Sequence, residues 1–113
     1  MVATCAGGHK GGFGKKLFIH WKYAIPLPGP DVIAPEYLGP LMCGGITAYK
    51  PIVDYSKPGD KCGVVGLGGI GCMAVMLLKA RGCHVTVFSR TEAKRANAME
   101  VGADSYVAMS DAD

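Results

Sequence analysis

The sequence predicts an α/β fold built around a parallel β-sheet, and two observations support this prediction. Between residues 62 and 109, three short runs of apolar, often β-branched residues alternate with two longer stretches that suit helices. An order of strand, helix, strand, helix, strand forms a parallel sheet with right-handed crossovers. The 113-residue chain is also 50% hydrophobic, which is too apolar for a disordered polypeptide and suits a packed core.

Glycines and turn residues mark the ends of the predicted elements. A turn at residues 56–60 precedes the first strand, and Gly82 and Gly102 each follow a helical stretch, where glycine accepts the left-handed conformation that ends helices. Thr91 is expected to open the second of these helices. The expected elements are, in chain order, a strand at residues 62–65, a helix over about 70–80, a strand at 84–88, a helix from 91 to about 101 and a strand at 105–109.

The region before this alternation holds all seven prolines, which interrupt regular structure. Residues 17–21 suit a strand, and residues 23–30 suit an extended segment, because each proline disfavours helix in the residue before it. Asp31 is expected to cap a short helix that runs toward Tyr37. A second helix is expected over about residues 43–55, although it contains glycines and a proline.

The stretch between the first strand and the next helix matches the pattern G-x-G-x-x-G. It reads Gly66-Leu67-Gly68-Gly69-Ile70-Gly71, and a strand before it with a helix after it is the context in which this pattern binds dinucleotides. The first glycine permits a tight turn, the second lets a pyrophosphate approach the backbone, and the third lets the helix pack closely on the sheet. The free N–H groups of the first helical turn then face the phosphates. The alternative is a glycine-rich turn that binds nothing.

The residues after the second strand indicate which nucleotide is preferred. An acidic residue about 20 positions beyond the glycine pattern would bind the ribose 2′-hydroxyl of NAD. Ser89, Arg90 and Lys94 stand there instead, and a hydroxyl, a guanidinium and an ammonium group suit the 2′-phosphate of NADP. Ser89 and Glu92 also have the spacing of a helix capping box, and the two basic residues alternatively read as surface charges. Capping and phosphate binding are compatible, so the sequence favours NADP over NAD.

Charge and cysteine content exclude several other classes of protein. The net charge is only +3 with no basic stripe, so nucleic-acid binding is not expected. No apolar run approaches the ~18 residues of a membrane span, and the N-terminus lacks the features of a secretory signal. The five cysteines form no C-x-x-C pair, which favours reduced thiols and a cytoplasmic location. Cys62, Cys72 and Cys83 are expected to be small core residues.

Longer strings of sequence extend these motifs. They lie at residues 11–13, 23–28, 40–49, 58–60, 64–71, 86–90 and 102–104. Together they resemble the zinc-dependent medium-chain alcohol dehydrogenases, and most closely the cinnamyl-alcohol dehydrogenase-like branch. The combination is specific although each piece alone is not, and the resemblance covers nearly all of residues 11–108.

The resemblance implies a two-part organisation. Residues 1–40 correspond to the C-terminal remnant of a GroES-like catalytic domain, and residues 41–113 to the N-terminal half of an NADP-binding Rossmann domain. The second part is then the first βαβαβ half of a Rossmann-type parallel sheet. The implied activity is that of an NADP-dependent oxidoreductase that interconverts a primary alcohol and an aldehyde by hydride transfer, with zinc as a Lewis acid. A small-molecule alcohol or aldehyde substrate and a homodimer are implied as well.

The resemblance also assigns roles to individual residues. Cys43 falls where the family places the third protein ligand of its catalytic zinc, and a thiolate binds zinc strongly. Thr47, one helical turn further on, matches a residue near the nicotinamide end of the cofactor. The glycine pattern matches the pyrophosphate site, and the basic residues after the second strand match the region that selects NADP.

The family's other zinc-binding motifs are missing from this chain. Neither the earlier Cys and His ligands of the catalytic zinc nor the four-cysteine structural site is present, so we expect a fragment that is inactive alone. A non-catalytic nucleotide-binding module and an inactive truncated remnant are the alternatives. A three-stranded half-sheet in the order 3-2-1 would also leave its first strand as an open apolar edge, which predicts marginal stability.

Overall fold

The structure is a computed structural model that describes residues 15–16 and 19–109. The chain divides into two compact units, Met1–Ile33 and Ala34–Asp113. In the first unit the described residues form a 3-10 helix, η1, at Trp21–Tyr23, where His20 Nδ1 accepts a hydrogen bond from the Lys22 backbone N–H at 3.2 Å. The predicted strand at residues 17–21 is therefore wrong over residues 19–21, because this local turn satisfies the backbone without a partner strand. Residues 17–18 lie outside the described part.

The second unit begins with helical segments that run directly into one another. They are α1 at Pro35–Pro40, a π-helical segment η2 at Leu41–Gly45, and α2 at Ile46–Tyr55. The helix expected over residues 43–55 is confirmed, with a π-helical first part. Asp31 does not cap α1, which corrects the prediction: Ala34 is the N-cap and Pro35 the first helical residue. Proline favours this first position because its fixed φ suits a helix and its missing N–H has no intrahelical partner there.

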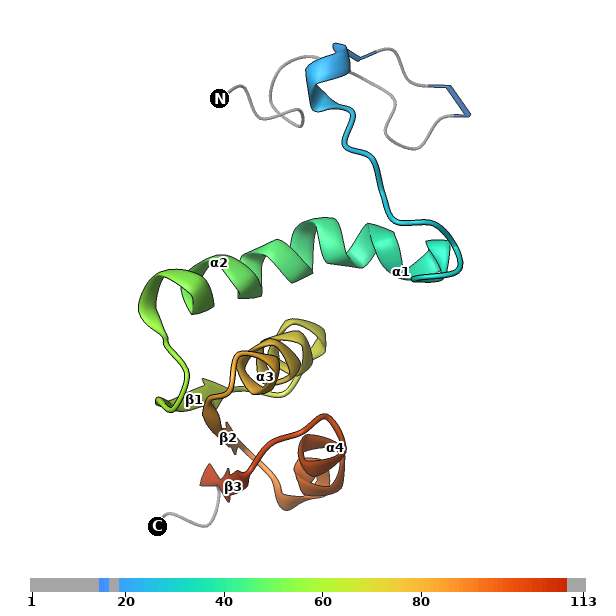
Figure 1. Cartoon of the computed structure of the whole chain (residues 1–113). Coiled ribbons are helices and arrows are strands. Elements are labelled where there is room, and N and C mark those ends of the chain that lie inside the picture. The colour runs from blue at the N-terminus through green and yellow to red at the C-terminus, as the bar shows by residue number, and fades with distance from the viewer. Residues whose placement is uncertain (1–14, 17–18, 110–113) are drawn as a thin grey trace. The chain divides into compact units, whose positions relative to one another are not determined.

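The predicted parallel sheet is present in the second unit (Figure 1). Its strands lie in the order β1-β2-β3, with Val64 beside Val87 and Val87 beside Tyr106. The α/β, Rossmann-type fold class is thereby confirmed. The strands are β1 at Lys61–Val65, β2 at His84–Ser89 and β3 at Ser105–Ala108, and the connecting helices are α3 at Gly69–Ala80, η3 at Glu92–Lys94 and α4 at Arg95–Glu100.

The helices α3 and α4 cover one face of this sheet, and the core lies between these helices and the sheet (Figure 1). Val85 and Val87 of the central strand are fully buried against Val75 of α3 and the other members of the core cluster. Residues of opposite parity point to the other face, where Val65 is 76% exposed and Val107 42% exposed. The sheet is therefore covered on one side within the described part of the chain, whereas parallel sheets are usually covered on both.

Cysteines contribute to this core, as the sequence predicts. Cys83 is buried, and Cys62 and Cys72 are half-buried and pack against the core cluster. All three are free thiols. Burial and the neighbouring Cys83 thiol raise the pKa of Cys62, so this thiol is neutral near pH 7 and weakly reactive.

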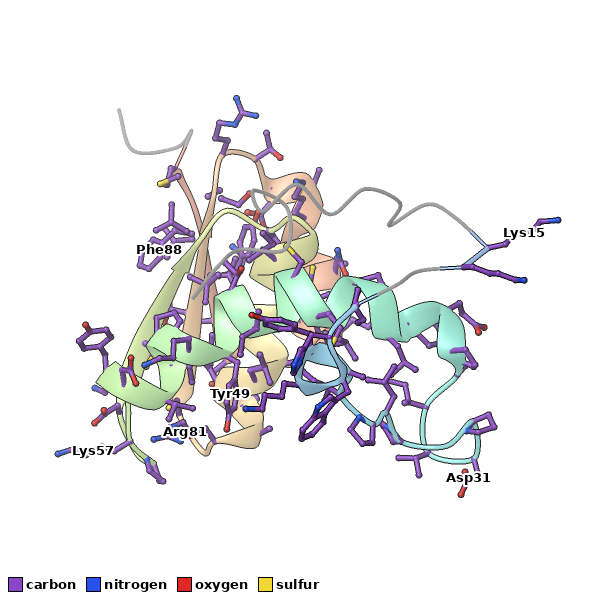
Figure 2. All side chains as sticks on the ribbon, turned by 90° about the horizontal axis from the view of Figure 1, so that it is seen from above. Lys15, Asp31, Tyr49, Lys57, Arg81 and Phe88 are labelled. Atoms are coloured by element: carbon purple, nitrogen blue, oxygen red, sulfur yellow. The ribbon has the colours of Figure 1, made fainter. Side chains whose placement is uncertain are left out.

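Side chains from α3 and the residue after it make two connections, one to α2 and one to the sheet. Arg81 donates from Nε and Nη2 to the carbonyl oxygen of Ser56 at 3.0 and 2.8 Å, which closes the C-terminal end of α2. Figure 2 shows Arg81 near Lys57, which follows Ser56 in the chain. The two hydrogen bonds of Arg81 hold α2 against α3 and so fix one wall of the cavity described below.

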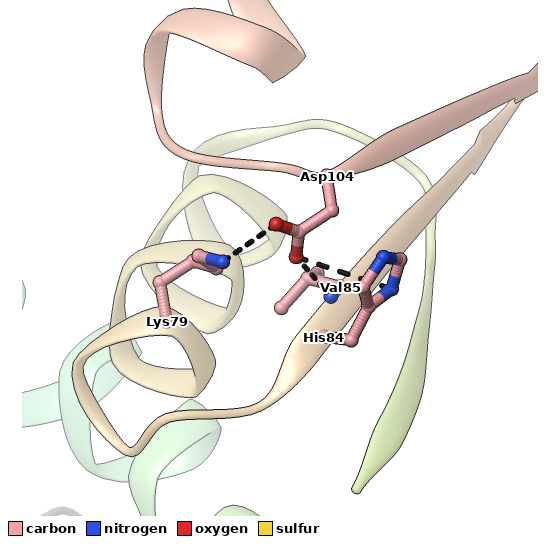
Figure 3. A network of polar contacts seen from close by, with 4 residues as sticks. All are labelled: Lys79, His84, Val85 and Asp104. Atoms are coloured by element: carbon pink, nitrogen blue, oxygen red, sulfur yellow. Dashed lines mark hydrogen bonds and ion pairs between the residues drawn. The ribbon is translucent and has the colours of Figure 1, made fainter. Parts of the chain in front are cut away.

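The second tie is Asp104, at the entrance to β3 (Figure 3). Its Oδ1 accepts from Lys79 Nζ of α3 at 2.7 Å, and its Oδ2 accepts from the Val85 N–H of β2 at 2.6 Å. The Asp104 N–H in turn donates to the Val85 carbonyl at 2.8 Å, and His84 Nδ1 lies 4.0 Å from Oδ2. The hydrogen bond from Lys79, followed by that from Val85, lowers the pKa of Asp104.

We expect Asp104→Asn to lower the thermal unfolding midpoint at neutral pH, because the carboxylate joins three elements. A lowered pKa in the folded chain means that this contribution is fully present above the ordinary Asp pKa of 3.8 and is lost as the pH falls through the lower folded value. The midpoint difference between the wild type and the variant should therefore be constant near neutral pH and shrink in acid. Thermal unfolding measured from pH 7 downward checks this.

The matched control for this prediction is Asp54→Asn. Among the described residues, Asp54 pairs only with Lys50, one turn away on the exposed face of α2. Surface pairs of this kind contribute little to stability. A midpoint lowered as much by Asp54→Asn as by Asp104→Asn would contradict the role given to Asp104.

Candidate nucleotide-binding site

The glycine pattern forms the connection between β1 and α3. Gly66 follows β1 with a φ of +87°, a conformation that favours glycine, and its N–H donates to the Phe88 carbonyl of β2 at 2.8 Å. A Cβ on Gly71 would lie 3.2 Å from the Gly66 carbonyl carbon and closer still to its oxygen. Gly71 thus lets the first turn of α3 touch the end of β1. The strand before the loop and the helix after it are those that the sequence predicts.

The first turn of α3 presents unpaired backbone N–H groups. The first hydrogen bond of the helix runs from the Cys72 N–H to the Gly68 carbonyl at 2.8 Å, so the N–H groups of the three preceding residues have no partner inside the helix. Gly68 is the N-cap and provides no side-chain cap, and the first turn carries no acidic residue. Gly68 and Gly69 have no atoms within 4 Å of their Cβ positions. This end of α3 is therefore open to an anion.

An open cavity of about 900 Å³ connects this loop with the end of β2 and with one side of α2. Of the site residues that the sequence predicts, all but Cys43 line it. They are Thr47, Gly66, Leu67, Gly68, Gly69, Ile70, Gly71, Ser89, Arg90 and Lys94. Leu67 differs from the others because its side chain is buried in the core, so only its backbone can face a ligand.

Sequence reasoning missed several residues that line the same cavity. They are Ala48, Pro51 and Ile52 of α2, Gly63, Val64 and Val65 of β1, Ala74 and Leu78 of α3, and Met109 after β3. Ala48, Pro51 and Ile52 lie on the same face of α2 as Thr47. Their spacing identifies them as lining residues only once α2 is known to pack on α3. They make one wall of the cavity apolar.

The end of β2 provides the polar and cationic part of the cavity. Ser89 is the last residue of β2 and is buried, Arg90 follows it and is exposed, and Lys94 Nζ donates to the Leu67 carbonyl at 3.0 Å. No acidic residue is among the described residues that line the cavity. The cavity therefore combines unpaired N–H groups at one end with two cations at the other.

The predicted capping box of Ser89 and Glu92 is wrong. Ser89 remains in the sheet, where it pairs with Ala108, and Thr91 is the N-cap of η3 without a side-chain hydrogen bond. Glu92 forms an ion pair with Arg95 instead. The ladder with β3 holds the Ser89 backbone extended, so Ser89 is not in the N-cap position of the helix.

Cys43 is not among the residues that line the cavity, although it lies one helical turn before Thr47. It is an exposed free thiol in the π-helical segment η2. Residues 15–16 and 19–109 contain no group of three His, Cys, Asp or Glu side chains able to hold a metal ion. A catalytic zinc needs about three protein ligands, so the residues that the structure describes do not complete such a site.

No helix in the described part of the chain is long and apolar enough to cross a membrane. The prediction that the chain does not bind nucleic acid is not tested by the structure and stays a prediction.

Comparisons with known proteins identify the sequences that this chain resembles. A family model described as zinc-binding dehydrogenase matches residues 69–113. A probable cinnamyl alcohol dehydrogenase of Populus deltoides is 41% identical over 107 residues, covering 92% of this chain and 29% of the relative. An NADP-dependent alcohol dehydrogenase of Saccharomyces cerevisiae is 42% identical over 100 residues, covering 88% of this chain and 27% of the relative.

Solved structures give the same result. A cinnamyl alcohol dehydrogenase of Sorghum bicolor aligns with a TM-score of 0.62 and 47% identity, over 65% of this chain and 22% of that one. A cinnamyl alcohol dehydrogenase of Helicobacter pylori, complexed with NADP(H), aligns with a TM-score of 0.57 and 40% identity, over 63% of this chain and 21% of that one. The chain spans less than a third of the length of the curated relatives named above. Over most of its length the chain is therefore similar in sequence to cinnamyl alcohol dehydrogenases, and about two thirds of it shares their fold.

Proposed function

We propose that this chain binds NADP(H) in its cavity, as the cofactor-binding part of an NADP-dependent alcohol dehydrogenase that interconverts a primary alcohol and an aldehyde. The observation that supports this proposal is the cavity itself. It joins a helix N-terminus with unpaired N–H groups to a cationic strand end without an acid. A dinucleotide with an extra phosphate on its adenosine ribose has charges at both of these places.

The diphosphate would lie against the first turn of α3. The N–H groups of Gly69, Ile70 and Gly71 have no intrahelical partner and would donate to its oxygens, with the helix dipole adding to the attraction. The open space around Gly68 is what a phosphate needs to approach the backbone. No side chain competes for this position, because α3 lacks a side-chain cap.

The 2′-phosphate would lie beyond the end of β2. Arg90 is exposed and can present its planar fork to two phosphate oxygens, and Lys94 adds a second positive charge at the same side of the cavity. Ser89 contributes a hydroxyl from the last position of β2. The absence of an acid from the described lining removes the repulsion that would favour NAD.

The nicotinamide end would extend toward Thr47 and the apolar wall of α2. When bound, NADP(H) supplies or accepts the hydride that is exchanged with the carbon of the alcohol or aldehyde. The role of this wall is to exclude water beside the nicotinamide, since Ala48, Pro51 and Ile52 are apolar and lie next to Thr47.

For zinc the proposal is narrower. Cys43 would supply one thiolate ligand by analogy with the family, and the described residues contain no group of three side chains able to complete a zinc site. For this reason a non-catalytic nucleotide-binding module is the second candidate function. Turnover of a primary aldehyde with NADPH would favour the first candidate over the second.

Location and assembly are also proposals. The free thiols of Cys43, Cys62, Cys72 and Cys83 are consistent with a reducing compartment and so support a cytoplasmic location. A homodimer rests on the family resemblance, and the domain division at residues 40 and 41 likewise remains a prediction.

The proposed cofactor preference is tested with two small probes that lack the nicotinamide. Titration calorimetry with adenosine 2′,5′-bisphosphate and with adenosine 5′-monophosphate compares ligands that differ only in the 2′-phosphate. We expect the bisphosphate to bind at least about 10-fold more tightly, because hydrogen bonds to charged groups contribute about 1.5–3 kcal/mol. Equal affinity for the two probes would contradict the proposed 2′-phosphate site.

A further inference from the structure

A single side-chain hydrogen bond joins the two phosphate-binding ends of the cavity. Lys94 Nζ, at the end of η3, donates to the carbonyl oxygen of Leu67 in the glycine loop at 3.0 Å. Within the described part of the chain, no other side chain donates to the loop at Gly66–Gly71. We propose that Lys94 is a positioning residue for the diphosphate loop, in addition to its contact with the 2′-phosphate. This inference rests on the proposed function, because it assigns a second role within the same site.

The carbonyl that Lys94 holds lies between an anchored residue and two glycines with little restriction on their backbone. The Leu67 side chain is 4% exposed and anchored in the core, whereas Gly68 and Gly69 follow it with no side chains to restrict the backbone. Because the peptide bond is planar and trans, the Leu67 carbonyl and the Gly68 N–H point in opposite directions in one plane. A bond that fixes the carbonyl therefore also fixes the direction of the Gly68 N–H. The backbone continues from this peptide directly to the N–H groups of residues 69–71, which would bind the diphosphate.

The turn that carries Lys94 is itself held in place. The Tyr106 hydroxyl of β3 donates to the Thr91 carbonyl, and Glu92 pairs with Arg95. Lys94 thus reaches the glycine loop from a tethered turn. The ammonium group has three donors, so a bond to Leu67 leaves two for a phosphate. Positioning of the loop and contact with the 2′-phosphate are compatible.

The consequence concerns NADH, which has a diphosphate but no 2′-phosphate. If Lys94 served only the 2′-phosphate, its loss would leave NADH binding unchanged. If Lys94 also orients the loop, its loss weakens the binding of both NADH and NADPH. The affinity for NADH therefore separates the two roles.

The first experiment is titration of NADH into the full chain and three variants. We expect Lys94→Met to weaken NADH binding about 10-fold, the change that corresponds to one charged hydrogen bond. Lys94→Arg, which keeps the charge and the donors, should restore most of the affinity. Lys50→Met is the control, because Lys50 pairs with Asp54 outside the cavity lining. Unchanged NADH affinity in Lys94→Met would overturn the proposal.

A second experiment needs no nucleotide. Hydrogen exchange of the peptide spanning residues 64–72 should be faster in Lys94→Met than in the wild type and in Lys50→Met, with the thermal midpoint little changed. A wild-type chain that binds neither nucleotide while showing this difference would contradict the proposed function and leave the loop contact supported. Equal exchange in all variants would overturn the positioning role, whatever the nucleotide affinities are.

Discussion

Replacing Gly71 with alanine should strongly destabilise the second unit. The new methyl group would overlap the Gly66 carbonyl, and backbone atoms cannot move aside as a flexible side chain can. Overpacking of this kind costs about 1–3 kcal/mol, which for a domain of this size lowers the thermal midpoint by ~5–20 °C. Thermal unfolding followed by circular dichroism measures the change.

Two neighbouring glycines provide matched controls for this substitution. A Cβ on Gly69 meets nothing within 4 Å, and alanine is a better helix former than glycine, so Gly69→Ala should be as stable as the wild type or more stable. Gly68→Ala should also fold, because Gly68 has a φ of −113° and open space around it. It should nevertheless weaken NADPH binding, since the methyl group occupies the approach of the diphosphate. Gly71→Ala and Gly69→Ala of equal stability would contradict the packing described here.

Replacing Arg90 with methionine should remove most of the preference for NADPH over NADH. Arg90 is exposed beside the cavity and precedes η3, so it can bind the 2′-phosphate without supporting the glycine loop. We expect the ratio of the two affinities to fall at least about 10-fold, because a bidentate charged contact is lost. Binding measured by quenching of intrinsic fluorescence gives both affinities from the same sample.

Two variants show whether the effect belongs to this position. Arg90→Lys keeps the charge but loses the planar fork, so its affinity ratio should lie between those of the wild type and Arg90→Met. Lys57→Met removes a positive charge from an exposed turn outside the cavity lining (Figure 2) and should leave the ratio unchanged. If Lys57→Met lowered the ratio as much as Arg90→Met, net charge and not a specific contact would explain the preference.

The part of the fold that the sequence predicts well is the part fixed by local rules. Each strand of the sheet is a short run that contains valine, and the glycines that end α3 and α4 have φ values of +86° and +103°. The ends of the glycine loop could be predicted in detail, because Gly66 takes a left-handed φ and Gly71 leaves no room for a Cβ. The residues proposed to bind the nucleotide follow from this loop by position along the chain, and all of them line one cavity.

The errors occur where contacts distant in sequence, or small local turns, decide the structure. Ser89 has the spacing of a cap, but pairing with β3 keeps it in the sheet. Asp31 has the chemistry of a cap, but Pro35 determines where α1 begins. The bond between Lys94 and Leu67 spans two loops, and no pattern in the sequence specifies it.

The open edge expected for the first strand is also found in the described part of the chain. β1 has β2 on one side and no strand on the other, and Val65 at its end is 76% exposed. Unprotected apolar edges of this kind pair with other chains. Because such pairing between chains increases with protein concentration, binding should be measured at low concentration.

The proposed function depends on NADP(H) binding in the cavity between the glycine loop and the end of β2. Calorimetric titration of the wild-type chain with NADPH and, separately, with NADH measures this binding. We expect one NADPH bound per chain and weaker binding of NADH. Binding of neither nucleotide, or tighter binding of NADH, would contradict the proposed function.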